Sequence, residues 1–171
     1  MDEWGGIRRD HPETCETYLK KYILQPWDIK DENYISFDSN AIDPQAEVSR
    51  IQRYLNQNGP LDFCVLGLGL NGHIAFNEPS AFLQAECHIA TLSEASKNHP
   101  MFVNMDDKPT YGLTLGMANI LQSKKILLVI LGKNKQAVIE KFFTKEITTS
   151  LPASFLWLHP NVDCLMLENN G

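Results

Sequence analysis

The sequence predicts an α/β fold, a Rossmann-like parallel sheet with helices on both faces. Apolar runs at 63–66, 126–131 and 162–167 are typical of buried parallel strands, which show continuous hydrophobic stretches. Segments with helical spacing of apolar residues alternate with these runs, and such alternation favours a parallel sheet covered by helices. With 171 residues and 43% hydrophobic content, we expect a single domain over residues 1–171 with a sizeable core.

The first part of the chain is expected to form a helix, a strand and a second helix before the first apolar run. The first helix begins near Pro12, because proline suits the first helical turn, and a short strand follows at 33–37. Asp43 is placed to cap a second helix that begins at Pro44, and the apolar stripe of this helix ends at the turn 58–60.

The later part of the chain continues the alternation. We expect a strand at 87–92, a helix at 114–121, another helix after Gly132 and a helical segment at 153–158. The polar segment 97–111 is the best candidate for a mobile loop or lid.

Composition excludes several classes of protein. The net charge of -6 and the pI near 5.3 argue against nucleic-acid binding, which needs clustered Lys and Arg. No apolar run approaches the roughly 18 residues of a membrane span, and the first residues lack the features of a signal peptide, so we expect a cytoplasmic protein. The cysteines are far apart without a CxxC pair, and we expect free thiols and no metal site. They are Cys15, Cys64, Cys87 and Cys164.

A glycine-rich turn follows the first apolar run and reads GLGLNGHIAFNEP over 67–79. Gly69 and Gly72 permit tight or left-handed backbone and a close approach of a ligand to the main chain. In open α/β sheets ligands bind at the carboxyl ends of the strands. The turn therefore predicts an active site built from its His, Asn and Glu. The alternative is an ordinary strand-to-loop turn in which His73 is a hydrogen-bonded core residue.

The run at 67–79 resembles the signature of the glucosamine-6-phosphate deaminase/isomerase family, which also includes galactosamine-6-phosphate isomerases. The segment DEW at 2–4 resembles the acidic catalytic segment of this family, and ILGKNK at 130–135 resembles its lysine-bearing strand-to-helix turn. The segments that are similar to the galactosamine branch are 15–19, 112–116 and 152–159. The resemblance spans nearly the whole chain.

The resemblance implies a reaction in which an aminosugar 6-phosphate opens its ring, moves a proton from C2 to C1 and releases ammonia. It implies that His73 transfers the proton between the anomeric and ring oxygens, and that Glu78 orients and polarises the imidazole. Asp2 matches the base that takes the C2 proton. Without the resemblance, an aspartate so near the chain start would be read as a solvated terminal residue. No cofactor is required.

Lys135 matches the need for a cation that holds the sugar phosphate. It falls in the first turn of the helix expected after Gly132, where free backbone N–H groups already favour an anion. Otherwise Lys135 is only a solvated charge. Gly69 and Gly72 are expected to let the substrate approach the backbone. The expected partner is a small sugar phosphate, and self-association into a homo-oligomer is left open.

The chain departs from the pattern of the glucosamine enzymes at two places in the site. Asn71 stands where those enzymes typically carry an aspartate, as in galactosamine-type relatives. An amide cannot carry a proton, so Asn71 would position the substrate or the imidazole. The alternative is a turn residue that tolerates left-handed backbone before Gly72. The phosphate-binding arginine has no clear match in 93–102, where Lys97 is a candidate substitute.

Family members begin well before the acidic segment, with strands, helices and a Gly-Thr/Ser-rich phosphate loop that have no counterpart here. We therefore expect an N-terminally truncated domain in which Asp2 lacks a supporting strand and frays. The absent elements are also expected to leave a sheet edge uncovered, which favours association.

The resemblance favours conversion of galactosamine 6-phosphate to tagatose 6-phosphate and ammonia. The alternatives are a glucosamine-6-phosphate deaminase that gives fructose 6-phosphate, and an inactive fragment or sugar-phosphate-binding module. A 6-phosphogluconolactonase, which shares the fold and a similar glycine-rich motif, is less favoured, because lactone hydrolysis does not need the carboxylate of Glu78. No residue can be assigned to read the C4 hydroxyl that separates the two aminosugars.

Overall fold

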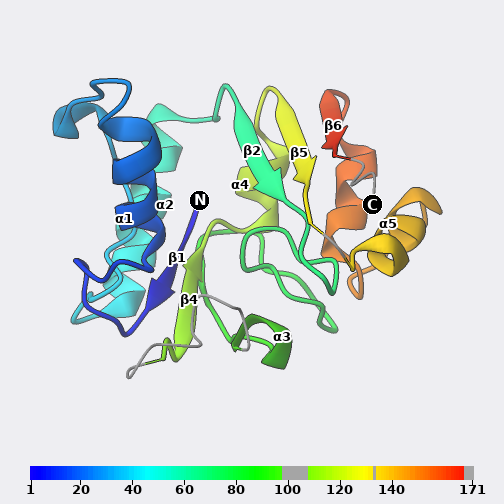
Figure 1. Ribbon diagram of the computed structural model, residues 1–171, viewed down its shortest axis with the longest axis horizontal. Helices are drawn as coiled ribbons and strands as arrows, with labels where there is room; N and C mark the ends of the chain where they lie inside the picture. Colours follow the sequence, from blue (N-terminus) through cyan, green and yellow to red (C-terminus); the bar gives the residue numbers. More distant parts are fainter. Residues whose placement is uncertain (98–107, 133, 168–171) are drawn as a thin grey trace.

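The computed structural model describes residues 1–97, 108–132 and 134–167, which form strands and helices in alternation (Figure 1). In chain order the elements are β1 (Asp2–Gly5), α1 (Cys15–Leu19), the π-helix η1 (Lys20–Leu24), the 3-10 helix η2 (Asp31–Asn33), α2 (Pro44–Asn58), β2 (Cys64–Gly67), β3 (His88–Ala90), α3 (Glu94–Lys97), β4 (Tyr111–Thr114), α4 (Met117–Leu121), β5 (Ile126–Ile130), α5 (Gln136–Phe143), the 3-10 helix η4 (Pro152–Leu158) and β6 (Val162–Met166).

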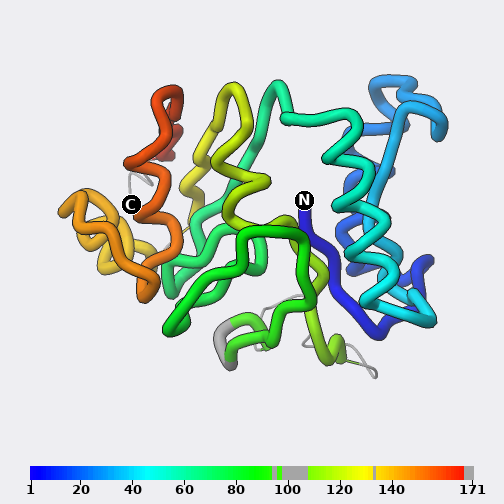
Figure 2. The backbone as a smooth tube through the Cα atoms, turned by 180° about the vertical axis from the view of Figure 1, so that it is seen from behind, coloured from blue at the N-terminus to red at the C-terminus, as the bar shows by residue number. Residues whose placement is uncertain are grey.

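Three of the strands form the predicted parallel sheet, in the order β2-β5-β6. Leu66 and Leu128 point into the core on one face, together with Met117 and Ile120 of α4. Figure 2 shows α4 in front of this sheet when the molecule is seen from behind. On the other face Val65 is 50% exposed, so burial of the two faces is unequal in the described residues. The α/β class with a parallel sheet and helices is confirmed.

The other three strands form a second, antiparallel sheet in the order β1-β4-β3. The strand predicted at 87–92 is present as β3. The helix predicted at 114–121 was placed too early, because Thr114 ends β4 and α4 begins only at Met117. Leu113 and Thr114 are fully buried between neighbouring strands. Cross-strand pairing therefore decides the conformation at this position.

Asp2 lies in a paired strand, so the expectation that it lacks a supporting strand is wrong. Asp2 is the register partner of Thr114, and β1 pairs with β4 over its whole length. The pairing extends by one residue, because the N–H of Leu115 donates to the carbonyl of Met1 at 3.0 Å. Strand β4 supplies this support. It was not predicted from the sequence, because its residues were assigned in part to a loop and in part to a helix.

The segment at 33–37 is not a strand, and this prediction is wrong. Residues 34–38 have no regular secondary structure. Two side chains of α2 take up backbone groups here: Arg50 donates to the carbonyl of Ser36 at 2.6 Å, and Glu47 accepts from the N–H of Asp38 at 2.7 Å. These contacts satisfy groups that a strand would use for its ladder. They also bind the segment to α2, which lies beside α1 in Figure 1.

The predicted helices form with their expected caps or close to them. The Asp43 side chain accepts from the N–H groups of Gln45 and Ala46, and Pro44 occupies the first helical position of α2. The first helix begins at Cys15 rather than near Pro12 and continues into η1. Residues 98–107 of the predicted loop lie outside the described residues.

Candidate active site

The turn after β2 is held by its own backbone. The N–H of Gly72 donates to the carbonyl of Gly69, and the N–H of Gly69 donates to the carbonyl of His73, both at 3.0 Å. Gly72 has φ of +87°, and an added Cβ would lie 2.2 Å from the side chain of Leu151. Backbone conformation and space therefore both require glycine at this position. The result is a fixed loop that presents His73 near the end of β2.

Gly69 is required for a different reason, because the ring of His73 lies directly over it. A Cβ on Gly69 would lie 2.4 Å from Cε1 of His73. The two predicted substrate-binding glycines thus have structural functions of their own, which place the imidazole. Contact of Gly69 and Gly72 with a substrate stays a prediction.

His73, Asn71 and Glu78 are brought together as predicted from the sequence. Nδ1 of His73 lies 2.8 Å from Oδ1 of Asn71 and 3.4 Å from Oε2 of Glu78. The amide nitrogen of Asn71 donates to the same Glu78 oxygen at 2.7 Å. Two oxygen acceptors beside Nδ1 favour the tautomer with the proton on Nδ1, which leaves Nε2 free to exchange protons with a ligand.

Asn71 has a specific place in this arrangement. Its side-chain oxygen accepts from the backbone N–H of His73 at 3.2 Å as well as facing Nδ1, and its nitrogen faces Glu78. The left-handed residues of this loop are Gly72 and Ala75, not Asn71. These contacts support a positioning function for Asn71 over the alternative of a left-handed turn residue.

Two serines complete the surroundings of Glu78 and were not foreseen from the sequence. Ser93 donates to Oε1 of Glu78 at 3.1 Å, and Ser96 of α3 donates to the same oxygen. Burial by itself would raise the pKa of Glu78, but hydrogen bonds from His73, Ser96 and Asn71 lower it to about 2. A serine that starts a four-residue helix carries no sequence signal for a site 15 residues earlier in the chain. Only the fold brings these hydroxyls to Glu78.

The lowered pKa of Glu78 predicts a specific dependence of stability on pH. The ionised carboxylate stabilises the fold above about pH 4.5, and this contribution is lost as the pH falls toward 2. A change of pKa from 4.5 to about 2 corresponds to about 3 kcal/mol. The wild-type free energy of unfolding should therefore fall over this range by about that much more than that of Glu78→Gln, as measured by urea unfolding at a series of pH values.

Glu140→Gln is the matched control, because Glu140 is an exposed carboxylate on α5 that accepts a hydrogen bond from the side chain of Gln136. Its acid dependence should match that of the wild-type chain. Equal slopes for the wild-type chain and Glu78→Gln would contradict the charge assigned to Glu78.

Asp2 lies in β1, a strand that contacts the site loop through the ring of Trp4. Side chains alternate across a strand, so Asp2 shares a face of β1 with Trp4, and the Trp4 ring lies 4.5 Å from that of Phe76 in the site loop. The register partner of Asp2, Thr114, accepts a hydrogen bond from the N–H of Phe76 at 3.1 Å. No hydrogen bond or ion pair joins Asp2 directly to His73 within the described residues.

Lys135 is drawn to the site loop by its amine, which donates to the carbonyl of Leu68 at 2.5 Å. It is the residue before α5 rather than part of its first turn. Burial lowers the pKa of this amine. Lys135 and His73 are therefore attached to the same loop, and a ligand phosphate would have to share the amine with a backbone carbonyl.

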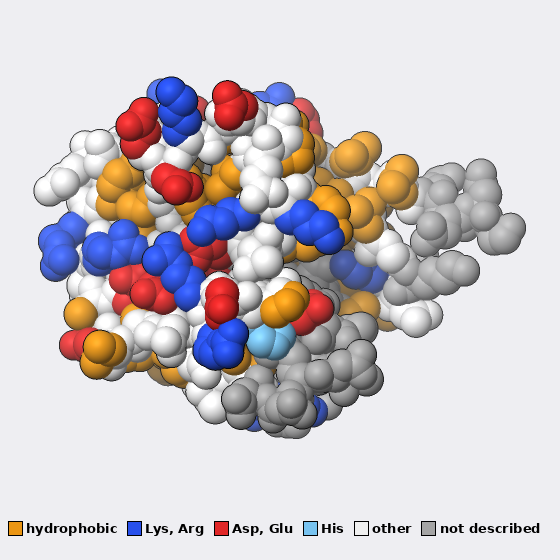
Figure 3. Space-filling view, turned by 60° about the vertical axis from the view of Figure 1, so that its left-hand side comes forward, with side chains coloured by type: hydrophobic (Ala, Val, Ile, Leu, Met, Phe, Trp, Pro, Cys, Tyr) orange, Lys and Arg blue, Asp and Glu red, His pale blue; other side chains and the backbone are white. Residues whose placement is uncertain are grey.

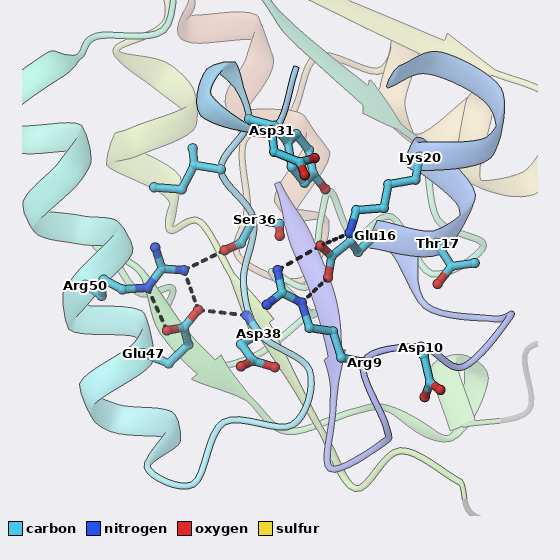
Figure 4. A pocket seen from close by; sticks show the side chains of 12 residues that line it. Arg9, Asp10, Glu16, Thr17, Lys20, Asp31, Ser36, Asp38, Glu47 and Arg50 are labelled. Carbon is cyan, nitrogen blue, oxygen red and sulfur yellow. Dashed lines mark hydrogen bonds and ion pairs between the residues drawn. The ribbon is translucent and has the colours of Figure 1, made fainter. Parts of the chain in front are cut away.

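A cavity of about 880 Å³ lies away from this loop, between α1, the segment 31–38 and α2 (Figure 4). The cations that line it pair with carboxylates: Arg9 and Lys20 contact Glu16, and Arg50 contacts Glu47. Figure 3 shows this mixture of Lys and Arg with Asp and Glu over the face formed by these helices. Because these cations are already paired with carboxylates, this cavity offers an anionic ligand little attraction.

Two further observations concern cofactors and membranes. In the described ranges, no group of three or more His, Cys, Asp or Glu side chains is arranged to hold a metal ion. None of the helices within those ranges is both long enough and apolar enough to cross a membrane. All four cysteines are free thiols, with Cys64 buried in β2 and Cys164 exposed in β6.

Comparisons with known proteins identify a family for this chain. Residues 6–166 match the family model described as glucosamine-6-phosphate isomerases/6-phosphogluconolactonase. The chain is 41% identical over 166 residues to AgaI of Escherichia coli (strain K12), a protein whose name assigns it provisionally as a deaminase. The match includes 97% of this chain and 66% of AgaI. It is 34% identical to the glucosamine-6-phosphate deaminase of Staphylococcus epidermidis, with 95% of this chain covering 68% of that protein.

The structure matches that of a monomeric glucosamine-6-phosphate deaminase, described as a missing link of the NagB superfamily, with a TM-score of 0.91 and 36% sequence identity. The match covers 97% of this chain and 70% of the other. The chain thus spans about two thirds of the length of the proteins that it matches. Because the family model matches most of its residues, the chain belongs to the glucosamine-6-phosphate isomerase/6-phosphogluconolactonase family.

Proposed function

We propose that this protein is an aminosugar-6-phosphate deaminase/isomerase that converts galactosamine 6-phosphate to tagatose 6-phosphate and ammonia. The observation that carries the proposal is the contact of His73 with Asn71 and Glu78 at the end of a parallel strand. A buried, ionised carboxylate behind an imidazole is an arrangement suited to repeated proton transfer. The substrate would be a small sugar phosphate, and the proposed chemistry needs no cofactor.

His73 would open the sugar ring. Nε2 accepts the proton of the anomeric hydroxyl and returns it to the ring oxygen, which leaves an open-chain aldehyde. While the imidazole carries the additional proton, Glu78 stabilises its positive charge from the Nδ1 side. Asn71 keeps the ring in place through its contact with Nδ1. This step needs Nε2 to be free, as the tautomer with its proton on Nδ1 provides.

Asp2 would then take the proton from C2 and deliver it to C1. The carbonyl oxygen gains a proton and the amino nitrogen loses one, so that the aldehyde carbon becomes an alcohol and C2 becomes an imine. Water adds to the imine and ammonia leaves, so that a ketose 6-phosphate remains and atoms balance. The antiparallel pairing of β1 with β4 supports Asp2 in this function, because it attaches the strand of Asp2 to the residue that binds the site loop. Lys135 would hold the phosphate at the other end of the substrate.

The choice of galactosamine over glucosamine depends on sequence features. The segments 15–19, 112–116 and 152–159 are similar to the galactosamine branch, and Asn71 replaces the aspartate of the glucosamine enzymes. Glucosamine 6-phosphate is the second candidate, because two proteins similar to this chain at 34% and 36% identity are named glucosamine-6-phosphate deaminases. A lactonase function is less favoured, because it leaves the bonding of Glu78 to His73 without a purpose.

Ammonia release by the purified chain tests the proposal, with galactosamine 6-phosphate and glucosamine 6-phosphate compared side by side. We expect turnover of both sugars with a higher kcat/KM for the galacto epimer. A preference for glucosamine 6-phosphate would overturn the substrate assignment but keep the reaction. If neither sugar releases ammonia although calorimetry shows that both bind, the protein is a sugar-phosphate-binding module and not an enzyme.

A further inference from the structure

Glu3 is a buried carboxylate that the proposed reaction does not use. It is 1% exposed and lies in β1, directly after Asp2. No Lys or Arg of the described residues forms an ion pair with it. A buried carboxylate without a cationic partner is costly unless hydrogen bonds compensate it. Hydrogen bonds to its two oxygens must therefore compensate the buried charge of Glu3.

Three backbone N–H groups supply that compensation. Oε1 of Glu3 accepts from Trp4 at 2.8 Å and from Cys15 at 2.9 Å, and Oε2 accepts from Glu16 at 2.7 Å. Cys15 and Glu16 are the first residues of α1, whose N–H groups have no partners within the helix. Glu3 thus attaches β1 to α1 across 13 positions of the chain. Burial raises the pKa of Glu3, and the three N–H donors oppose that rise.

This attachment lies on the opposite side of the strand from the site. Asp2 and Trp4 share the face of β1 toward Phe76, whereas Glu3 points to the other face, toward α1. β1 has four residues and pairs with β4 alone among the described strands. Pairing with β4 therefore holds one edge of β1, and the hydrogen bonds of Glu3 to α1 hold the strand from a second direction.

We propose that Glu3 is a positioning residue, which holds the strand of Asp2 by accepting hydrogen bonds from α1. The inference rests on the proposed function, because it assigns Glu3 a purpose in placing the C2 base. Glu3 does not touch the substrate. It limits the movement of β1, and catalysis by positioned groups tolerates little displacement, since about 1 Å can cost roughly a hundredfold in rate.

Glu3→Gln tests this proposal with almost no change in shape. The amide keeps one acceptor oxygen and places an N–H donor against a backbone N–H, so that either the contact to Glu16 or both contacts to Trp4 and Cys15 become repulsive. We expect kcat for ammonia release to fall by about 10- to 100-fold with KM nearly unchanged. In an Asp2→Asn background the same substitution should have no further effect on kcat, because the group that it positions is absent.

Glu47→Gln is the matched control. Glu47 is also a buried carboxylate that accepts a backbone N–H, from Asp38 at 2.7 Å, but it contacts Arg50 and lies on α2. Its loss should lower thermal stability and leave kcat near the wild-type value. An equal decrease of kcat in both variants, or an additive effect of Glu3→Gln on Asp2→Asn, would show a general structural function and overturn the proposal.

Hydrogen exchange separates this proposal from the proposed function. The β1 amides that bond to β4 should exchange faster in Glu3→Gln than in Glu47→Gln, whether or not the chain releases ammonia. If exchange in β1 is unchanged, Glu3 does not hold the strand and the inference is wrong. If exchange increases but the wild-type chain has no activity, the deaminase function fails and the attachment of β1 stands.

Discussion

Replacement of His73 by alanine is expected to lower ammonia release by about 10²- to 10⁴-fold, the usual contribution of a general acid–base group. The reason is that ring opening loses the imidazole, which lies beside both Asn71 and Glu78. The defect should lie in the first step. Exchange between the α and β anomers of the substrate, followed by NMR with stoichiometric protein, should slow to the uncatalysed rate.

The matched control for this substitution is His88→Ala. His88 is a partly buried histidine of β3 whose Nδ1 faces the carbonyl of Glu86, outside the site loop. We expect its ammonia release to stay within about twofold of wild type, and circular dichroism should show the same fold in both variants. Wild-type ammonia release in His73→Ala would remove His73 from the mechanism.

Replacement of Asp2 by asparagine is expected to reduce ammonia release by a similar factor of about 10²–10⁴, but at a different step. Asparagine keeps the shape of the side chain and cannot accept the C2 proton. Anomer exchange should therefore continue at the wild-type rate, whereas deuterium from the solvent should no longer enter the C2–H and C1 positions. His73→Ala should lose anomer exchange, whereas Asp2→Asn should keep it. This difference would separate ring opening from proton transfer within one site.

Asp62→Asn serves as the control for this change. Asp62 is an exposed aspartate that pairs with Lys124 at 2.6 Å, before the start of β2. It should leave both anomer exchange and ammonia release unchanged. If Asp2→Asn retains deuterium incorporation, another group takes the C2 proton, and the function proposed for Asp2 is wrong.

Local features of the sequence were sufficient for several elements and for the centre of the site. β2, β5 and β6 follow from their apolar runs, and α2 follows from the cap and proline at its start. His73, Asn71 and Glu78 lie within eight residues, so the turn that joins them is a local structure. These three side chains therefore meet within one turn, although distant residues such as Thr114 and Leu115 also hold the loop.

The sequence alone could not predict the features that depend on distant segments. The strand predicted at 33–37 does not form, because Arg50 and Glu47 of α2 take up its backbone groups. The pairing of β1 with β4 was also missed, although it gives Asp2 its support. In both cases the conformation is decided by partners that lie at least nine residues away, and a local pattern carries no information about them.

The sequence by itself determined the class of fold, the glycine-rich turn and the three polar residues that it brings together. Only the tertiary structure decided how those residues are surrounded, with Ser93 and Ser96 on Glu78 and with Glu3 on the opposite side of the strand of Asp2. The physical reason is that apolar periodicity and turn geometry act over a few residues, whereas hydrogen bonds to a buried carboxylate form wherever packing brings a donor close.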